Sequence, residues 1–217
     1  MKKSIITLIV ALLATLGAYA HNPVHRVLFI GDSMTGWLAE RMEAYGEVNN
    51  FEVTTVVWDG STLSKWVNTG KIPAYIAQYK PDVVMICLGL NELLARDPGA
   101  QMGAPLQKLE KQLGSTPFVW IGPPVWPGKG TGEAFNNWMA AHMGAHGHYF
   151  NSQSQKLARQ SATNPHPTRA ACSQWMDAIM HHLPAFNIGF PEQIQSPAAG
   201  AMKRGKVFIY RRMKQTL

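Results

Sequence analysis

Short apolar runs alternate along this chain with longer stretches in which apolar and polar residues recur with the period of a helix. The runs typical of buried strands cover residues 27–30, 51–58, 83–88, 117–121 and 148–150. The helical stretches cover residues 34–46, 72–79, 102–113, 133–144 and 167–183. Strands that alternate with helices predict an α/β fold, in which a doubly wound parallel sheet has right-handed crossovers and helices on both faces. The expected architecture is therefore a single three-layer domain.

The first 20 residues show a different pattern. Lys2 and Lys3 precede an apolar run over residues 5–16, and residues 18–20 (Ala-Tyr-Ala) match an A-x-A cleavage site. This arrangement predicts a cleavable signal peptide, and hence a periplasmic or secreted protein, with an uncleaved N-terminal anchor as the alternative. The apolar run is too short to cross a bilayer and no later run is long enough, so we expect no membrane span.

The segment after residue 185 is basic and less regular than the rest. Its cations are Lys203, Arg204, Lys206, Arg211, Arg212 and Lys214. Residues 207–210 predict an edge strand whose flanking charges discourage aggregation, and a role in binding a glycan or an acidic surface is the alternative. We therefore divide the chain into a signal peptide (1–20), an α/β domain (21–185) and a basic C-terminal extension (186–217).

Composition limits the classes of partner. The chain carries 20 Lys and Arg against 13 Asp and Glu, a net charge of +7. Removal of the signal peptide takes away two lysines and no acid, and the resulting charge of +5 favours acidic partners such as anionic glycans. The chain has no dense basic helix and no aromatic–basic repeat, so we expect no nucleic-acid partner. Cys87 and Cys172 are expected to be free thiols, although export would permit a disulfide.

Residues suited to acyl transfer follow the predicted strands. Ser33 lies on the turn after the first strand, where its hydroxyl can attack a carbonyl while its N–H helps to hold the oxyanion. The alternative is that Ser33 caps the following helix. Gly60 follows the second strand and Asn91 the third, and both offer further oxyanion donors; His166, before the last helix, can act as the base. Because ligands of such sheets bind at the carboxyl ends of the strands, we expect these residues to meet.

The order of these residues resembles the SGNH (GDSL-type) hydrolase family. The resemblance is carried by Gly31-Asp32-Ser33, Gly60, Gly89-Leu90-Asn91-Glu92 and His166-Pro167-Thr168, within residues 27–183. It implies a flavodoxin-like fold, an ester hydrolase activity, and neither a metal nor another cofactor. It also implies that Ser33 is the nucleophile and His166 the base. The implied oxyanion hole consists of Ser33, Gly60 and Asn91.

One position departs from the family pattern. Members of the family usually carry an aspartate three residues before the histidine, and this chain has Thr163 there. In a serine protease the corresponding acid orients the imidazole, and its neutralisation lowers turnover by about 10⁴. We therefore expect His166 to be oriented by the Thr163 carbonyl or by an acid from elsewhere in the chain. The next acid, Asp177, lies well along the last predicted helix.

Other residues near the strand ends are candidates for binding the substrate. Trp58 and Trp126 lie where an indole can stack on a sugar ring, although packing in the core is the alternative. Glu92 is expected either to hold a neighbouring loop or to contact the substrate. The three histidines within residues 142–148 (H-x3-H-x-H) lack a carboxylate or cysteine partner, so we expect a solvated helix end and no metal site.

Together these features predict an exported serine esterase that works through an acyl-enzyme. The expected substrate is an ester-bearing small molecule or an acylated glycan, from which a small acyl group, acetyl in the first place, is removed. An O-acyltransferase that passes the same acyl group to a glycan is one alternative. A non-catalytic glycan-binding protein on a decayed hydrolase fold is another, and Thr163 in place of the acid favours it.

Overall fold

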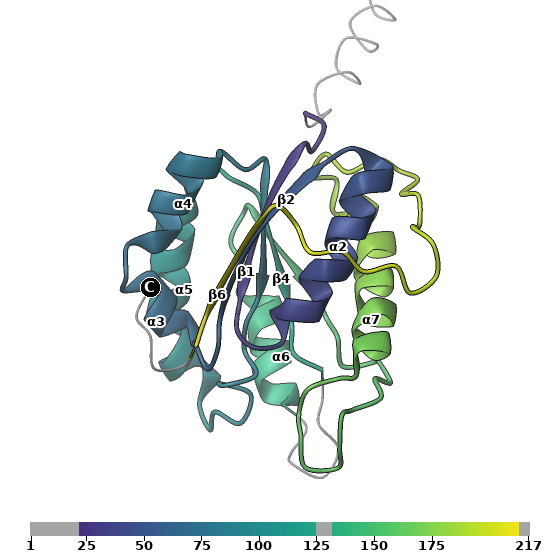
Figure 1. The fold of residues 1–217 in the computed structure, drawn as a ribbon. Helices are drawn as coiled ribbons and strands as arrows, with labels where there is room; N and C mark the ends of the chain where they lie inside the picture. The colour runs from purple at the N-terminus through teal and green to yellow at the C-terminus, as the bar shows by residue number, and fades with distance from the viewer. Residues whose placement is uncertain (1–21, 125–131, 213–217) are drawn as a thin grey trace, which may run out of the picture.

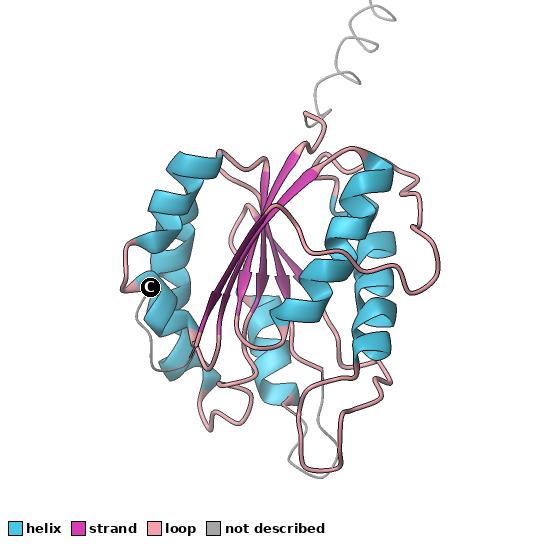
Figure 2. Cartoon of the chain, viewed as in Figure 1, coloured by secondary structure: helices cyan, strands magenta, loops and turns pink. Residues whose placement is uncertain are grey.

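A parallel sheet organises the structure, a computed structural model that describes residues 22–124 and 132–212. Its six strands run in the order β5-β4-β3-β1-β2-β6 (Figures 1 and 2). They are β1 (Arg26–Gly31), β2 (Glu52–Trp58), β3 (Val83–Cys87), β4 (Phe118–Ile121), β5 (Gly147–Phe150) and β6 (Val207–Arg211). Each pair of neighbours is parallel, as predicted. The predicted signal peptide and Trp126 lie outside the described residues.

Helices cover both faces of this sheet (Figure 1). On one face lie α2 (Thr35–Asn49) and α7 (Arg169–His182), which continues into the 3-10 helix η1 (Leu183–Phe186). The other face carries α3 (Leu63–Val67), α4 (Lys71–Tyr79), α5 (Pro98–Leu113) and α6 (Glu133–Ala141). Successive side chains of a strand point to opposite faces. In β1, Phe29 accordingly packs in the α2/α7 core and Leu28 in the α3–α6 core. The predicted three-layer α/β architecture is confirmed.

Some helix ends differ from the prediction because local caps decide them. The Asp97 side chain caps α5, and Pro98 suits its first turn, so this helix begins one turn before the predicted residue 102. Pro167 lies outside α7, whose N-cap is Thr168. The helix α6 is shorter than predicted and ends at Ala141. The helix α3 is absent from the prediction because five residues are too few to show a helical period.

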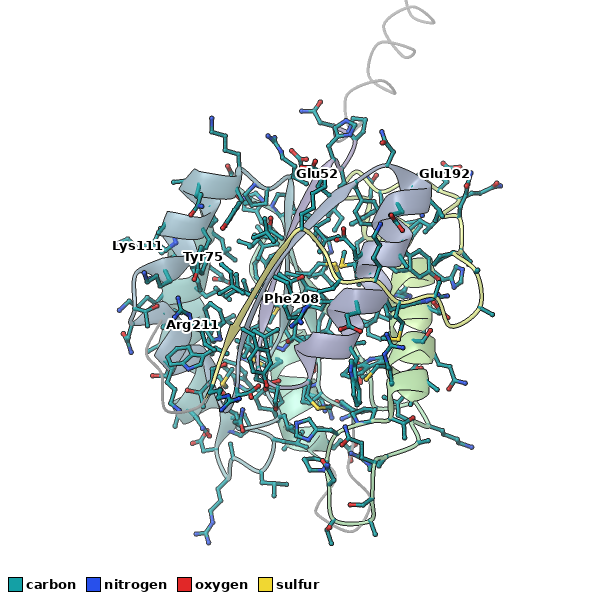
Figure 3. All side chains as sticks on the ribbon, in the orientation of Figure 1. Glu52, Tyr75, Lys111, Glu192, Phe208 and Arg211 are labelled. Atoms are coloured by element: carbon teal, nitrogen blue, oxygen red, sulfur yellow. The ribbon has the colours of Figure 1, made fainter. Side chains whose placement is uncertain are left out.

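The C-terminal extension contributes the strand β6 to the sheet. This strand pairs in parallel with β2, with Arg211 opposite Trp58, so the predicted edge strand is present. Phe208, labelled in Figure 3, packs against the α2/α7 core. Ile209 packs against the α3–α6 core. The edge strand therefore takes part in the packing of both faces.

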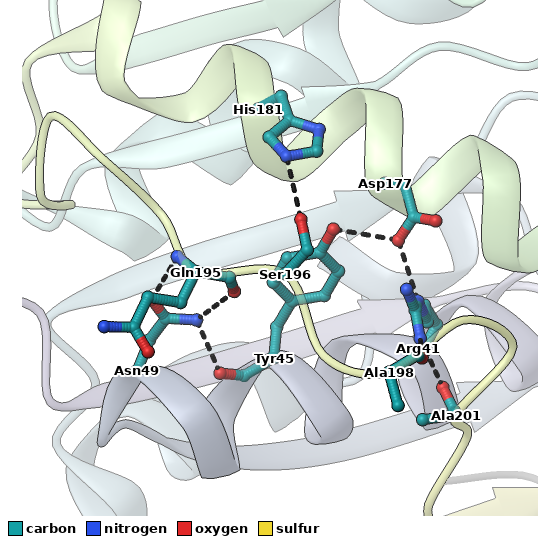
Figure 4. Close-up of polar contacts among 9 residues, drawn as sticks. All are labelled: Arg41, Tyr45, Asn49, Asp177, His181, Gln195, Ser196, Ala198 and Ala201. Atoms are coloured by element: carbon teal, nitrogen blue, oxygen red, sulfur yellow. Dashed lines mark hydrogen bonds and ion pairs between the residues drawn. The ribbon is translucent and has the colours of Figure 1, made fainter.

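A partly buried ion pair holds the segment that leads to β6 (Figure 4). The Arg41 side chain, 2% exposed, pairs with Asp177 at 2.7 Å. It also donates to the carbonyls of Ala198 and Ala201, at 2.8 Å each. The Tyr45 hydroxyl donates to the same Asp177 oxygen at 2.8 Å. Asp177 is therefore engaged between α2 and α7 and is not the acid that the sequence left open for the imidazole.

Replacement of Arg41 by alanine is expected to lower the free energy of unfolding by about 2–4 kcal/mol. The change removes the donor of two carbonyls and the cation that pairs with Asp177, and the Tyr45 hydroxyl and the partial exposure of Asp177 moderate the loss. Urea unfolding measures the effect. Lys203→Ala is the control, because it removes an exposed cation whose ion pair with Glu47 lies at the surface. Equal midpoints for both variants would contradict this role of Arg41.

Candidate active site

Ser33 lies on the turn between β1 and α2, with its hydroxyl directed at a histidine. Its Oγ is 2.8 Å from Nε2 of His166, which comes from a loop far along the chain. The N-cap residue of α2 is Met34, so Ser33 does not cap the helix. The turn is tight because Gly31 has no side chain, and a Cβ there would lie 2.2 Å from the carbonyl oxygen of Cys87.

Backbone hydrogen bonds close the loop that carries His166. The Gln160 N–H donates to the His166 carbonyl at 3.0 Å, and the Thr168 N–H donates to the Ala158 carbonyl at 2.8 Å. The imidazole is half-buried in the position that these bonds fix, and its burial lowers the pKa of His166 from the usual value. The imidazole is therefore neutral at neutral pH, which is the form that a general base requires.

The other imidazole nitrogen contacts Asn164. Its Oδ1 lies 2.7 Å from Nδ1 of His166 and accepts the backbone N–H of the same histidine at 2.9 Å. A backbone N–H can only donate, so the Asn164 atom that faces both groups is the oxygen. Nδ1 must then carry the ring proton, and the lone pair of Nε2 faces the Ser33 hydroxyl. Asn164 thus sets the tautomer that general-base chemistry needs.

Gln160 holds the Asn164 amide in this orientation. The Asn164 Nδ2 group donates to Oε1 of Gln160 at 3.0 Å, and Gln160 Nε2 donates to the carbonyl of Pro167 at 3.3 Å. Thr163, the residue that the sequence analysis favoured, is exposed and contacts Ser161 instead. The residue that contacts the imidazole is therefore Asn164, one position after the expected Thr163. The loop turns the Asn164 side chain back towards His166.

Two backbone N–H groups on the turns after β1 and β2 are free to donate. The N–H groups of Ser33 and Gly60 have no acceptor among the described residues. Gly60 lies on the turn after β2 with a φ of +63°, a conformation that glycine adopts at little cost. Free N–H groups at the carboxyl ends of β1 and β2 are suited to hold an oxyanion.

The third predicted oxyanion donor, Asn91, reaches the site in a different arrangement. Its Nδ2 group donates to the Ser61 carbonyl at 2.8 Å and to Asp32 Oδ2 at 3.3 Å. These two acceptors take both amide hydrogens, so in this arrangement Asn91 braces the turns after β1 and β2. Asp32 is fully buried and accepts the Met34 N–H at 2.9 Å, and burial raises the pKa of Asp32 to about 8. Its carboxyl group is therefore mostly protonated at neutral pH.

A pocket of about 390 Å³ opens beside the Ser33–His166 pair. Its wall includes Met34, Trp37, Asp59, Pro167, Cys172 and Tyr210. Sequence reasoning missed Asn164, Trp37, Asp59 and Tyr210. A signal existed for two of them, because Asn164 lies two residues before His166 and Asp59 directly precedes Gly60.

The structure reassigns two of the predicted substrate-binding residues. Trp58 is only 6% exposed and packs edge-on against Trp66, with 5.9 Å between the ring centroids. It belongs to the α3–α6 core and does not line the pocket. Glu92 is buried, and its Oε1 accepts the Leu63 N–H at 2.7 Å, so it holds the start of α3. That was one of its two expected roles.

Two further expectations concern metal and thiol chemistry. Within the described ranges, no group of three or more His, Cys, Asp or Glu side chains is placed to hold a metal ion. His142, from the histidine-rich segment, stacks on Trp138 with 4.2 Å between the ring centroids. Cys87 and Cys172 are free and buried, in agreement with the expectation of two thiols. No helix in the described part of the chain is long and apolar enough to cross a membrane.

Solved structures show which fold this is. The chain is similar to TesA, with 21% identity and a TM-score of 0.54 over 71% of this chain and 96% of that one. It is also similar to a G-D-S-L family lipolytic protein from Desulfitobacterium hafniense, with 16% identity and a TM-score of 0.53 over 71% and 97% of the two chains. The chain has the SGNH hydrolase fold.

A third structure with this fold is a family 3 carbohydrate esterase from Clostridium thermocellum. It shares 12% identity with this chain at a TM-score of 0.58, over 75% of this chain and 96% of that one. No protein-family model matches the chain, and no curated protein matches its sequence. The SGNH hydrolase fold places the Ser33–His166 pair at the carboxyl ends of the central strands, beside the point where the strand order reverses between β1 and β3.

Proposed function

We propose that this protein is a serine esterase in which Ser33 is the nucleophile and His166 the general base. One observation carries the proposal: the unprotonated Nε2 of His166 faces the Ser33 hydroxyl at 2.8 Å, with the ring proton held at Nδ1 by Asn164. A serine with such a neighbour is activated for attack on a carbonyl. The SGNH hydrolase fold and the free N–H groups of Ser33 and Gly60 support the same chemistry.

The reaction proceeds in two halves. As the Ser33 Oγ forms a bond to the ester carbonyl carbon, its proton moves to Nε2 of His166, and the N–H groups of Ser33 and Gly60 bind the oxyanion. The carbon–oxygen bond to the alcohol then breaks, and Nε2 returns the proton to the leaving oxygen. Water attacks the acyl-enzyme in the second half, again losing its proton to Nε2, and the acid product leaves as the proton returns to Ser33.

The proposed substrate is a carbohydrate or cell-wall glycan that carries a small acyl group, with acetyl the first candidate. The pocket of about 390 Å³ is bounded by Trp37 and Tyr210, whose rings are suited to the face of a sugar. The predicted signal peptide would deliver the protein to a compartment that contains such glycans. Carbohydrate esterases occur among the proteins with this fold, which supports the substrate class by analogy.

Turnover of aryl esters of increasing chain length tests the acyl preference. We expect kcat/KM for an acetyl ester to exceed that for an octanoyl ester by at least about tenfold, because the pocket of about 390 Å³ has to hold the leaving group as well as the acyl chain. A maximum of kcat/KM at acyl chains of eight or more carbons would contradict the small-acyl proposal, and the protein would still be an esterase.

Covalent labelling by a serine-reactive phosphonate separates the esterase from a non-catalytic glycan-binding protein, in which Ser33 is not activated. Product analysis with a glycan acceptor separates hydrolysis from acyl transfer.

A further inference from the structure

The neutral side chain beside the candidate base leaves one task of a catalytic triad unfilled. The acid of a Ser-His-Asp triad orients the imidazole, and its negative charge stabilises the imidazolium that forms during the reaction. Asn164 accomplishes the first task through its contact with Nδ1 of His166. An amide carries no net charge, so Asn164 does not accomplish the second task.

Asp59 is placed to supply that charge. It follows β2 directly and lines the same pocket as Ser33 and His166. Burial lowers the pKa of His166, and the negative charge of Asp59 acts in the opposite direction, in favour of the protonated ring. No cation among the described side chains forms an ion pair with Asp59. Within residues 22–124 and 132–212, its charge is therefore not neutralised by an ion-pair partner.

The C-terminal strand holds this carboxylate in place. The Tyr210 hydroxyl of β6 donates to Asp59 Oδ2, and the Asp59 N–H donates to the Arg211 carbonyl at 2.9 Å. Asp59 Oδ1 is buried and has no hydrogen-bond partner in the structure. A buried acceptor without a donor costs free energy, and a catalytic role is one reason why native proteins keep such an atom. The extension that carries β6 thus fixes the position of a charge at the site.

The other titratable groups around the pocket do not replace this charge. Burial raises the pKa of Cys172 and of Tyr210 to about 12 each, so both are neutral at neutral pH. Asp32, beneath the nucleophile, is mostly protonated for the same reason. The Arg159 guanidinium donates to the carbonyl of Pro165, the residue before His166, and as a cation it cannot supply a negative charge. Among the described residues that line the pocket, the negative charge rests with Asp59.

We propose that the two tasks of the triad acid are divided in this protein: Asn164 orients the imidazole of His166, and Asp59, held by Tyr210 of β6, stabilises its protonated form. Asp59 is a positioning residue in this scheme, since it acts through His166 on the Ser33 reaction. The proposal rests on the proposed serine esterase function and adds a role for the C-terminal strand.

The pH dependence of kcat/KM tests this division. Because the charge of Asp59 raises the pKa of His166, Asp59→Asn should move the acidic limb of the profile to lower pH by about one unit and lower kcat about tenfold. Tyr210→Phe is the matched control, because it removes the hydrogen bond and keeps the carboxylate. It should leave the acidic limb within about a third of that shift. Addition of Asn164→Asp to Asp59→Asn should restore kcat, since it puts a charge beside Nδ1.

Any of the following results would overturn the proposed division of tasks between Asn164 and Asp59. An unchanged acidic limb in folded Asp59→Asn, or equal effects of Asp59→Asn and Tyr210→Phe, would assign Asp59 a structural role only. Asp59→Ser is a second variant without the charge. If circular dichroism shows that neither Asp59→Asn nor Asp59→Ser folds, Asp59 likewise has a structural role only. Failure of the proposed esterase function can be told apart from failure of this proposal. If the protein is not a serine esterase, Ser33→Ala leaves turnover unchanged, independently of the result for the Asp59 variants.

Discussion

Ser33→Ala is expected to lower kcat for aryl acetate hydrolysis by about 10⁴- to 10⁶-fold, the loss found when a serine hydrolase loses its nucleophile. No other hydroxyl is assigned to attack in the proposed mechanism, and His166 would be left facing a methyl group. The residual rate would reflect binding by the Ser33 and Gly60 N–H groups alone. Steady-state kinetics with the purified protein measures the effect.

Ser154→Ala is the matched control for this experiment, because Ser154 is an exposed serine away from the pocket. It should retain wild-type turnover and react with a serine-directed phosphonate. Ser33→Ala should show neither property while keeping the same far-ultraviolet circular dichroism. Phosphonate labelling of Ser33→Ala at the wild-type level would mean that another residue is the nucleophile, and the proposed function would fall.

Asn164→Leu is expected to lower kcat by about 10²- to 10³-fold. Leucine is close to asparagine in size but offers no acceptor for the Nδ1 proton, so the ring populates the tautomer in which Nε2 carries the proton and cannot act as a base. In a serine protease, a histidine held in the wrong tautomer lowers kcat by about 10⁴-fold. A histidine that is free to adopt either tautomer should lower it less. Asn164→Asp keeps the acceptor and is expected to retain activity at or above the wild-type level.

Two neighbouring substitutions show whether the loss comes from the tautomer or from the loop. Gln160→Leu removes the acceptor that fixes the Asn164 amide, so it should give a smaller loss, about tenfold, in the same direction. Thr163→Ala changes an exposed side chain next to Asn164 and should have no effect. If Thr163→Ala is as damaging as Asn164→Leu, the loop as a whole matters, and the specific role of the Asn164 oxygen is wrong.

An amide in place of the usual acid changes how the site is to be understood. The sequence alone left the orientation of His166 to the Thr163 carbonyl or to a distant acid, and it made a decayed, non-catalytic protein a reasonable alternative. The contacts of Asn164 weaken that alternative, because an ordered acceptor for Nδ1 and a network that fixes its orientation are both present. Because Asn164 is neutral, the proposal above assigns the charge of the triad acid to Asp59.

The C-terminal extension has a structural position that its composition does not reveal. Its basic residues suggested a surface-binding tail or an edge strand. In the structure its described part passes over α2 and α7, held by Arg41, and leads into β6, whose Tyr210 lines the pocket (Figures 1 and 4). Tyr210 reaches Asp59 from this strand. The extension therefore contributes to the proposed chemistry because β6 brings Tyr210 to Asp59, and not because the extension is basic.

The sequence by itself determined the order of strands and helices and the residue types at the strand ends. Parallel strands bring their carboxyl ends to one edge of a sheet, so Ser33 and Gly60 could be assigned to one site before any coordinates were known. What only the tertiary structure decided are the contacts that depend on side-chain direction or on distant chain segments. Asn164 faces the imidazole because of the path of a short loop, Trp58 is buried because α3 covers it, and Asp59 meets Tyr210 across 151 positions of sequence. A local pattern fixes periodicity and turns, whereas these contacts arise only when the whole sheet is assembled.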